Sequence, residues 1–231
     1  MIPLPVGCPL FEGVRPEDCA RLLAVASMRE VAENDFVFHQ GDPAGAAYIV
    51  AGGTGNVRAG ALGGAEKQLM VEIFKQGDLF GELAALDGTA RSAEAMALGG
   101  PVRLAVLPAG PFREALADVP RLGANLALLL ASRLRRTFTL LQDATFERLE
   151  VRLARQLLYM AKRDGRPGPD GVRLGQRINQ EDLADLMGAT TRSVITILNA
   201  WRAHGVLRHD TRTGRVILPD PECLVRLVEG G

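Results

Sequence analysis

The chain has 231 residues, 47% of them hydrophobic and 23% charged, which suits two domains with apolar cores. No apolar run approaches the roughly 18 residues that a membrane-spanning helix needs, and the first residues lack the pattern of a signal peptide. We therefore expect a cytoplasmic protein without a membrane partner. The three cysteines lack metal-ligand spacing and exclude a four-cysteine iron–sulfur site, so we interpret them as reduced thiols; they are Cys8, Cys19 and Cys223.

The formal net charge is zero, but the charges are unevenly distributed. Residues 148–231 contain 14 Lys or Arg and 10 Asp or Glu, whereas residues 1–147 contain 13 and 17. A basic C-terminal part is what binding to nucleic-acid phosphates requires. The chain also contains no recognisable Ser/His/Asp, metal-ligand or phosphate-loop constellation, so we do not expect an enzyme.

The N-terminal part is predicted to be a helix followed by many short strands. Residues 16–31 have the apolar spacing of an amphipathic helix, with Pro16 at its start. Short apolar segments then alternate with turn residues; these segments are 35–42, 46–53, 55–60, 67–74, 93–100 and 102–108. Short strands at regular spacing indicate an antiparallel barrel or roll.

Within this roll, residues 80–93 (FGELAALDGTARSA) have the residue types of a site for a small anion. Gly81 opens a short helical turn and lets the backbone approach a phosphate, which N–H groups at a helix start attract. Arg91 can grip the phosphate with its planar guanidinium, and Ser92 can add a hydroxyl. Because a phosphate would repel Glu82, a ribose hydroxyl is the natural partner of that carboxylate. The alternative is that Glu82 and Arg91 pair within the fold.

Residues 120–148 are predicted to form one long helix, because neither proline nor glycine interrupts them after residue 123. A 3-4 repeat marks one face as the seam of a two-stranded coiled coil, so we expect a homodimer; the seam residues are Ala127, Leu130, Leu134, Thr137, Leu141 and Ala144. Thr137 is the only polar member, and it costs stability there unless it has a partner. Three arginines are expected on the outer face, where they keep the helix soluble; these are Arg133, Arg135 and Arg136.

Residues 179–200 (NQEDLADLMGATTRSVITILNA) are predicted to form two short helices that meet at a sharp turn. Apolar residues recur at helical spacing in both halves, Gly188 suits the turn, and Asn179 and Thr190 suit the helix starts. The remaining polar face suits base edges and phosphates in a major groove, although a helical hairpin with a solvated face is the alternative. We expect DNA contacts from Asn179, Thr190, Thr191, Arg192, Ser193, Ile195, Thr196 and Asn199.

The following segment predicts a winged form of this motif. Residues 206–218 (VLRHDTRTGRVIL) have the pattern of two strands around a turn. Such a hairpin presents its arginines to the DNA backbone; here they are Arg208, Arg212 and Arg215. Trp201 is expected to be a core residue that locks the second helix to this wing. Residues 164–171 (DGRPGPDG) cannot be helical and are expected to be a projecting loop.

The order of these motifs makes the chain similar to the Crp/Fnr family of bacterial transcription regulators over essentially its whole length. Residues 80–93 resemble the phosphate-binding cassette of cyclic-nucleotide-binding domains, and residues 37–53 resemble the strands that precede it. The resemblance implies an α+β fold in three parts. These are a cyclic-nucleotide-binding β-roll (1–120), a dimerisation helix (121–147) and a winged helix-turn-helix that reads a palindromic operator (148–231).

The resemblance also implies ligand contacts. Cyclic phosphate and ribose would be bound by Gly81, Glu82, Leu83, Arg91, Ser92 and Ala93, with cyclic AMP as the first candidate and cyclic GMP as the second. Thr137 matches the threonine that contacts the adenine amino group in cyclic-AMP-dependent members; the alternative is that it only sets helix register. Phe138 departs from the pattern, because those members often have a serine there that reaches from the partner subunit.

Two further positions bear on partners. The commonest DNA readers of the family have Glu at the position of Arg192 and Arg at the position of Thr196. Since Glu accepts from cytosine and Arg donates to guanine, the preferred half-site should differ from the familiar one. Residues 164–171 match a loop that can contact RNA polymerase, and a plain connector is the alternative.

The predicted function is therefore that of a ligand-responsive, sequence-specific DNA-binding regulator controlled by a cyclic nucleotide. Within the same family, the alternative is a regulator that needs no ligand or responds to redox state, haem or a gas. A cyclic-nucleotide-binding module without DNA binding is a further alternative, against which the helix-turn-helix counts.

Overall fold

The computed structural model describes residues 7–62, 68–175, 177–210 and 213–230. The chain forms two compact units, one of residues 1–66 and 71–137 and the other of residues 67–70 and 138–231. The boundary between them falls within the long helix α4, Pro120–Phe146, which the sequence predicted as a segment of its own. Arg212, one of the predicted DNA contacts, lies outside the described residues.

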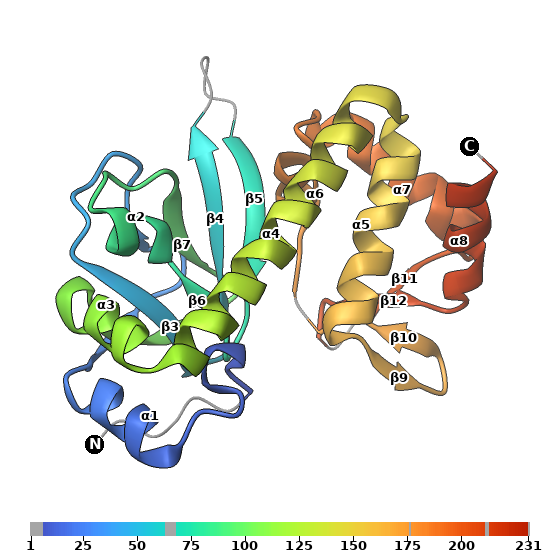
Figure 1. The fold of residues 1–231 in the computed structure, drawn as a ribbon. Coiled ribbons are helices and arrows are strands. Elements are labelled where there is room, and N and C mark those ends of the chain that lie inside the picture. The colour runs from blue at the N-terminus through green and yellow to red at the C-terminus, as the bar shows by residue number, and fades with distance from the viewer. Residues whose placement is uncertain (1–6, 63–67, 176, 211–212, 231) are drawn as a thin grey trace. The chain divides into compact units, whose positions relative to one another are not determined.

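The first unit is a β-roll flanked by helices (Figure 1). Its two four-stranded sheets have the strand orders β1-β8-β3-β6 and β2-β7-β4-β5. The strands are β1 (Ser27–Val31), β2 (Phe36–Phe38), β3 (Ala46–Gly53), β4 (Asn56–Leu62), β5 (Gln68–Phe74), β6 (Leu79–Phe80), β7 (Glu94–Leu98) and β8 (Val102–Pro108). Val50 and Leu104 of one sheet share a buried apolar cluster with Val57 and Ala95 of the other, so the sheets face each other. The predicted roll is confirmed.

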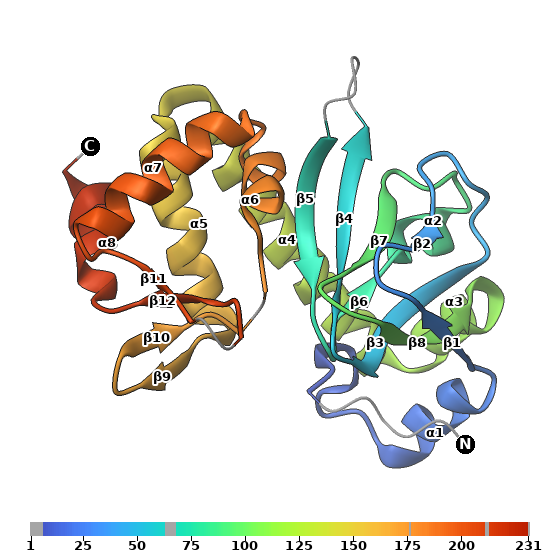
Figure 2. The ribbon, with the colours of Figure 1, turned by 180° about the vertical axis from the view of Figure 1, so that it is seen from behind.

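Short helices close one end of the roll and surround a second apolar cluster. These elements are the 3-10 helix η1 (Pro9–Phe11), α1 (Pro16–Ala24) and α3 (Ala109–Asp118), with α2 (Glu82–Asp87) between β6 and β7. Figures 1 and 2 both show α1 and α3 side by side. Leu122 and Leu126 of α4 are buried in the same cluster as Phe112 of α3, so apolar burial fixes the first half of α4 against the roll.

The predicted helix over residues 16–31 is wrong beyond its middle. The helix ends at Ala24, and Ser27–Val31 is strand β1, paired antiparallel with β8 from Ser27↔Val106 to Val31↔Val102. Four of the five β1 residues are exposed, so this segment has no buried face whose period would have revealed a strand. Hydrogen bonds to β8, which lies far away in the sequence, decide its conformation.

The described residues of the second unit form further helices and a small sheet (Figure 2). The helices are α5 (Leu149–Asp164), α6 (Gln180–Met187), α7 (Thr191–Ala203) and α8 (Pro221–Glu229). The sheet has the order β11-β12-β10-β9, with strands β9 (Arg166–Gly168), β10 (Gly171–Arg173), β11 (Arg208–His209) and β12 (Val216–Leu218). The pair β11–β12 confirms the predicted wing strands.

Residues 164–171 are not the plain connector that was the alternative interpretation, and Asp164 is not part of a loop, because it is the last residue of helix α5. They contain β9 and lead into β10, and Val172 of β10 pairs with Leu218 of the wing. Gly171 permits this close approach, since it has φ = 113° and a Cβ there would lie 2.2 Å from the carbonyl oxygen of Leu218. The segment therefore extends the wing sheet instead of merely connecting helices.

Candidate functional site

The turn from β6 into α2 depends on Gly81. This residue has φ = 67°, and a Cβ on it would lie 2.9 Å from Nη1 of Arg91 and 3.2 Å from ring atoms of Phe38 and Tyr48. Glycine is therefore required both for the left-handed backbone and for the space. The sequence predicted that a ligand approaches the backbone here, whereas in the structure the close neighbour is Arg91.

Arg91 is buried in the roll, with 4% of its surface exposed. Its Nη1 and Nη2 donate to the carbonyl oxygens of Gly81 and Ala46, both at 2.7 Å. The guanidinium carbon lies 4.2 Å from the centre of the Phe38 ring, at cation–π distance. Its Nε is buried without a hydrogen-bond partner among the described residues. Two carbonyls thus use two of its five N–H donors and leave capacity for an anion.

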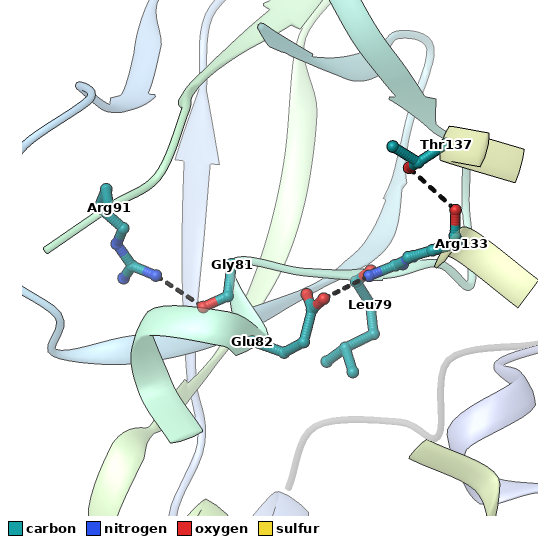
Figure 3. Close-up of polar contacts among 6 residues, drawn as sticks. All are labelled: Leu79, Gly81, Glu82, Arg91, Arg133 and Thr137. Atoms are coloured by element: carbon teal, nitrogen blue, oxygen red, sulfur yellow. Dashed lines mark hydrogen bonds and ion pairs between the residues drawn. The ribbon is translucent and has the colours of Figure 1, made fainter. Parts of the chain in front are cut away.

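Glu82 does not pair with Arg91, so that alternative is wrong. Its carboxylate is also buried, and it accepts a hydrogen bond of 2.7 Å from Nη1 of Arg133 on α4 (Figure 3). Nη2 of Arg133 donates to the carbonyl oxygen of Leu79, and the guanidinium lies 5.0 Å from the centre of the Phe74 ring. Arg133 therefore neutralises the carboxylate that the sequence assigned to a ribose.

A second arginine of α4 makes a similar contact with β5. Nε of Arg136 donates to the carboxylate of Glu72 at 3.1 Å, and each of these side chains is 15% exposed. The prediction that Arg133 and Arg136 lie on an outer, solubilising face is therefore wrong. The roll presents buried carboxylates and an aromatic ring to this side of α4, and periodicity alone could not reveal those partners.

Thr137 lies one turn beyond Arg133 and is exposed, with its hydroxyl donating to the carbonyl oxygen of Arg133 at 3.0 Å (Figure 3). Leu134, Phe138 and Leu141 are also exposed, by 56%, 61% and 63%. Their spacing of four and three residues places these three on one face of α4. Phe138 therefore joins the predicted apolar seam, and Thr137 lies between that seam and the side of α4 that contacts the roll.

The other predicted ligand residues lie in the same segment of the roll. Leu83 is 49% exposed on α2, whereas Ala84 and Ala85 beside it are buried. Ser92 is exposed immediately after Arg91, and Ala93 is half-buried. Arg91 itself is tied to the loop before β3, because its backbone N–H donates to Asp42 and its carbonyl accepts from Gly41, both at 2.9 Å.

In the second unit, the predicted helix-turn-helix is confirmed in its local detail. Asn179 and Asp182 form a capping box at the start of α6, with hydrogen bonds of 2.8 and 2.9 Å. Gly188 ends α6 in the left-handed conformation, and Thr190 caps α7 by accepting from the N–H of Ser193. The side chains of Asn179 and Thr190 thus already accept hydrogen bonds as helix caps, and any contact with DNA would be additional.

The outer face of α7 carries the predicted base-reading residues. Arg192, Ser193, Thr196 and Asn199 are exposed, and Thr191 and Ile195 are half-buried. Asn199 accepts a hydrogen bond of 2.8 Å from Arg202, a contact that the sequence did not suggest. Trp201 is a core residue, as predicted, but its indole N–H donates to Glu150 of α5 at 3.1 Å and so fixes α7 to α5.

Sequence comparison agrees with both parts of this geometry. Residues 28–118 match the cyclic nucleotide-binding domain family, and residues 151–227 match the Crp-like helix-turn-helix domain family. The CRP-like cAMP-activated global transcriptional regulator of Mycobacterium tuberculosis is 30% identical over 94% of this chain and 95% of its own length. The cyclic AMP receptor protein of Thermus thermophilus is 34% identical over 87% and 89%. The chain belongs to the Crp/Fnr family.

Solved structures of Crp/Fnr regulators have the same fold. The Thermus thermophilus catabolite activator protein matches with a TM-score of 0.53 and 30% identity over 96% of this chain and 99% of that one. FixK2 of Bradyrhizobium japonicum matches with a TM-score of 0.77 and 20% identity over 88% and 97%. The protein is thus a transcription regulator with a cyclic-nucleotide-binding domain and a DNA-binding helix-turn-helix, and not an enzyme.

The structure of this Crp/Fnr regulator was also searched for metal-binding groups, reactive thiols and membrane-spanning helices. Within the described residues, no group of three or more His, Cys, Asp or Glu could hold a metal ion. Burial raises the pKa of the Cys8 thiol to about 11, and burial also raises the pKa of Cys19. Thiols with raised pKa react slowly, which does not suit a redox sensor. No single described helix is long and apolar enough to cross a membrane, although α3 and α4 together, bent by 109°, pass the same test.

The two glycines that flank α2 provide a test of this packing. Gly81→Ala introduces a left-handed alanine and a Cβ against Arg91, whereas Gly88→Ala, at φ = 74°, introduces the same backbone strain with nothing within 4 Å. We expect Gly88→Ala to cost about 1–2 kcal/mol and Gly81→Ala to cost more, since only the latter displaces a buried guanidinium. Thermal unfolding of both variants measures the difference in stability. Equal losses of stability would show that Arg91 can move away from the added Cβ at no cost.

Proposed function

We propose that this regulator binds a 3′,5′-cyclic nucleotide in the roll, with cyclic AMP as the first candidate and cyclic GMP as the second, and that the ligand controls its affinity for a palindromic DNA operator. The observation that carries the proposal is the buried Arg91, whose Nε has no hydrogen-bond partner among the described residues. Two relatives named for cyclic AMP, each similar over most of the chain, support this choice of ligand.

The residues present fit a cyclic phosphate. A buried guanidinium with unused N–H donors is stabilised by an anion, and Ser92 beside it can add a hydroxyl. Helix α2 has only six residues, so the dipole at its start is weak. Most of the positive charge that balances the phosphate must therefore come from Arg91. Leu83 and Ala93 would border the phosphate. Gly81 would allow the left-handed turn and hold Arg91 through its carbonyl oxygen.

The ribose and base would lie toward α4. Glu82 can accept from a ribose hydroxyl while one of its oxygens remains bound to Arg133. Thr137 would contact the base from the next turn of α4. We expect the ligand to act by favouring one position of α4, because Arg133 and Thr137 belong to the helix that also carries the exposed seam.

The DNA part of the proposal assigns α7 to the major groove. Its exposed face offers hydroxyl, amide and guanidinium groups that suit base edges, and its start offers backbone N–H groups to phosphate. The wing would contact the DNA backbone through its arginines, Arg212 among them. The protein would act in the cytoplasm as a homodimer, and β9–β10 would be the segment available to RNA polymerase.

Removing the guanidinium tests ligand binding. Arg91→Ala should weaken cyclic-nucleotide binding about ten- to hundredfold, because it deletes a charge-assisted contact worth roughly 1.5–3 kcal/mol. Isothermal titration calorimetry measures the change. Arg29→Ala is a matched control, since Arg29 also donates to two backbone carbonyls of the roll, those of Val37 and Phe36. Absence of binding to the wild type at millimolar cyclic AMP and cyclic GMP would contradict the proposal.

The seam is tested by charge substitution. Leu134→Asp with Leu141→Asp should convert a dimer into monomers or insoluble protein, because carboxylates would be buried across the axis. Leu128→Asp is the control, since Leu128 is 67% exposed but lies off the line of Leu134 and Leu141. Sedimentation velocity at micromolar concentration distinguishes the species. A monomeric wild type would show that the exposed face serves another purpose.

The coupling between nucleotide binding and DNA binding is tested on an operator selected from random DNA. Ligand should tighten wild-type binding, and Thr137→Ala should reduce this gain more than it reduces binding without ligand. Arg192→Ala should lose about 1–3 kcal/mol of base discrimination and keep its nucleotide affinity, whereas Arg226→Ala on α8 should leave both properties unchanged. Fluorescence anisotropy with and without nucleotide measures both effects. Equal operator affinities in the two conditions would mean that DNA binding is independent of the ligand.

A further inference from the structure

Three side chains join the end of α4 to α5. The chain reverses direction after Phe146 and enters α5 at Leu149 (Figure 1). Arg155, in the second turn of α5, donates through Nη1 to the carboxylate of Asp143 and through Nη2 to that of Glu147, the latter at 2.9 Å. One planar guanidinium thus binds both the last turn of α4 and the connection that follows it.

This contact is buried enough to restrict the connection. Asp143 is 6% exposed, and the side chains of Arg155 and Glu147 are 32% and 28% exposed. A carboxylate with so little access to water needs its cationic partner, and a guanidinium that binds two carboxylates has one favourable orientation. The last turn of α4 and the start of α5 are therefore held at a fixed angle.

Helix α5 is also bound to both helices of the helix-turn-helix. Glu150 accepts a hydrogen bond of 3.1 Å from the indole N–H of Trp201 on α7. Arg152 donates to the carbonyl oxygen of Met187, the last residue of α6. Helix α5 thus connects the end of α4 to α6 and α7 through polar contacts that fix direction as well as distance.

The same end of α4 carries part of the exposed seam. Residues 138–146 belong to the second compact unit, and Phe138 and Leu141 among them are 61% and 63% exposed. In the proposed homodimer, two copies meet along this seam. The separation of their two α7 helices then depends on the angle between α4 and α5.

We propose that Arg155 is a positioning residue that fixes the half-site spacing which the dimer accepts on DNA. The inference rests on the proposed homodimer and palindromic operator, and it names the side chain that sets the geometry of that operator. Half-sites one helical turn apart are separated by about 34–36 Å, so one inserted base pair moves a half-site by about 3.4 Å and rotates it by about 35°. A dimer with rigidly held α7 helices follows this change only by distorting the DNA.

An operator selected from random DNA, and a copy with one base pair inserted between its half-sites, measure the spacing preference of the full-length protein. Fluorescence anisotropy in millimolar cyclic AMP gives both affinities. The wild type should bind the inserted operator about tenfold or more weakly, and Arg155→Met should reduce this ratio to about threefold or less, because α7 is no longer held to the seam. A loss of folded protein lowers both affinities equally, so the ratio reports geometry and not stability.

Further variants separate positioning from folding. Arg155→Met leaves the Asp143 carboxylate buried without a cation, whereas Asp143→Leu with Arg155→Met replaces the pair by apolar groups and should lose the spacing preference to the same extent. Arg155→Lys keeps a cation between the two carboxylates and should retain most of the preference. Arg148→Met is the matched control, since Arg148 is exposed at the same connection and does not cap α5 with its side chain.

The possible failures are distinguishable. A wild type that binds no selected operator, or binds both spacings equally, would overturn the proposed palindromic operator and this inference together. A preference that is strong in the wild type and unchanged in Arg155→Met and in the double variant would overturn the role of Arg155 and leave the proposed function in place. An equal loss of preference in Arg148→Met would also overturn it, since any change at the connection would then have the same effect.

Discussion

The burial of two opposite charges, Arg91 and Glu82, inside an apolar roll is the constraint on which the rest of the first unit depends. A buried charge is tolerated only when it is paired or well hydrogen-bonded. Arg91 meets this requirement with two carbonyl oxygens, which is why Gly81 must be a left-handed glycine beside it. Glu82 meets it through Arg133, so the requirement extends to α4. An anion that enters would meet the donors of Arg91 that the two carbonyls leave unused, among them the buried Nε.

Helix α4 has three kinds of surface as a result. One side contacts the roll through Leu122, Leu126 and the two paired arginines, and another exposes an apolar line that includes Phe138. Thr137 lies between them. A ligand that exchanges hydrogen bonds with Glu82 alters the interactions that hold one side of the helix, and the rigidity of a helix transmits such a change to its other sides. Differential affinity for two positions of α4 is all that a ligand needs to shift between them.

Local pattern was sufficient for much of this fold. Strands β2 to β5, β7 and β8, the caps of α6 and α7, and the wing strands follow from turn residues and apolar spacing, because those signals act over a few positions. The pattern failed where distant segments decide the outcome: in β1, which pairs with β8, and in β10, which pairs with β12. The same reason hid the partners of Arg133 and Arg136. Nothing in α4 itself indicates that carboxylates of the roll face these arginines.

Phe138 bears on how contacts to the base would be shared between two subunits under the proposed function. Cyclic-AMP-dependent relatives resemble this chain at Thr137 but often use a partner's serine where this chain has Phe138. Phenylalanine has no hydrogen-bonding group in its side chain, so under the proposed function the polar contact from α4 to the base would come from Thr137. The partner then contributes apolar packing by Phe138 instead of a hydrogen bond. Base selection and dimer coupling thereby become separable, since the first depends on Thr137 of one chain and the second on how α4 of each chain packs along the seam.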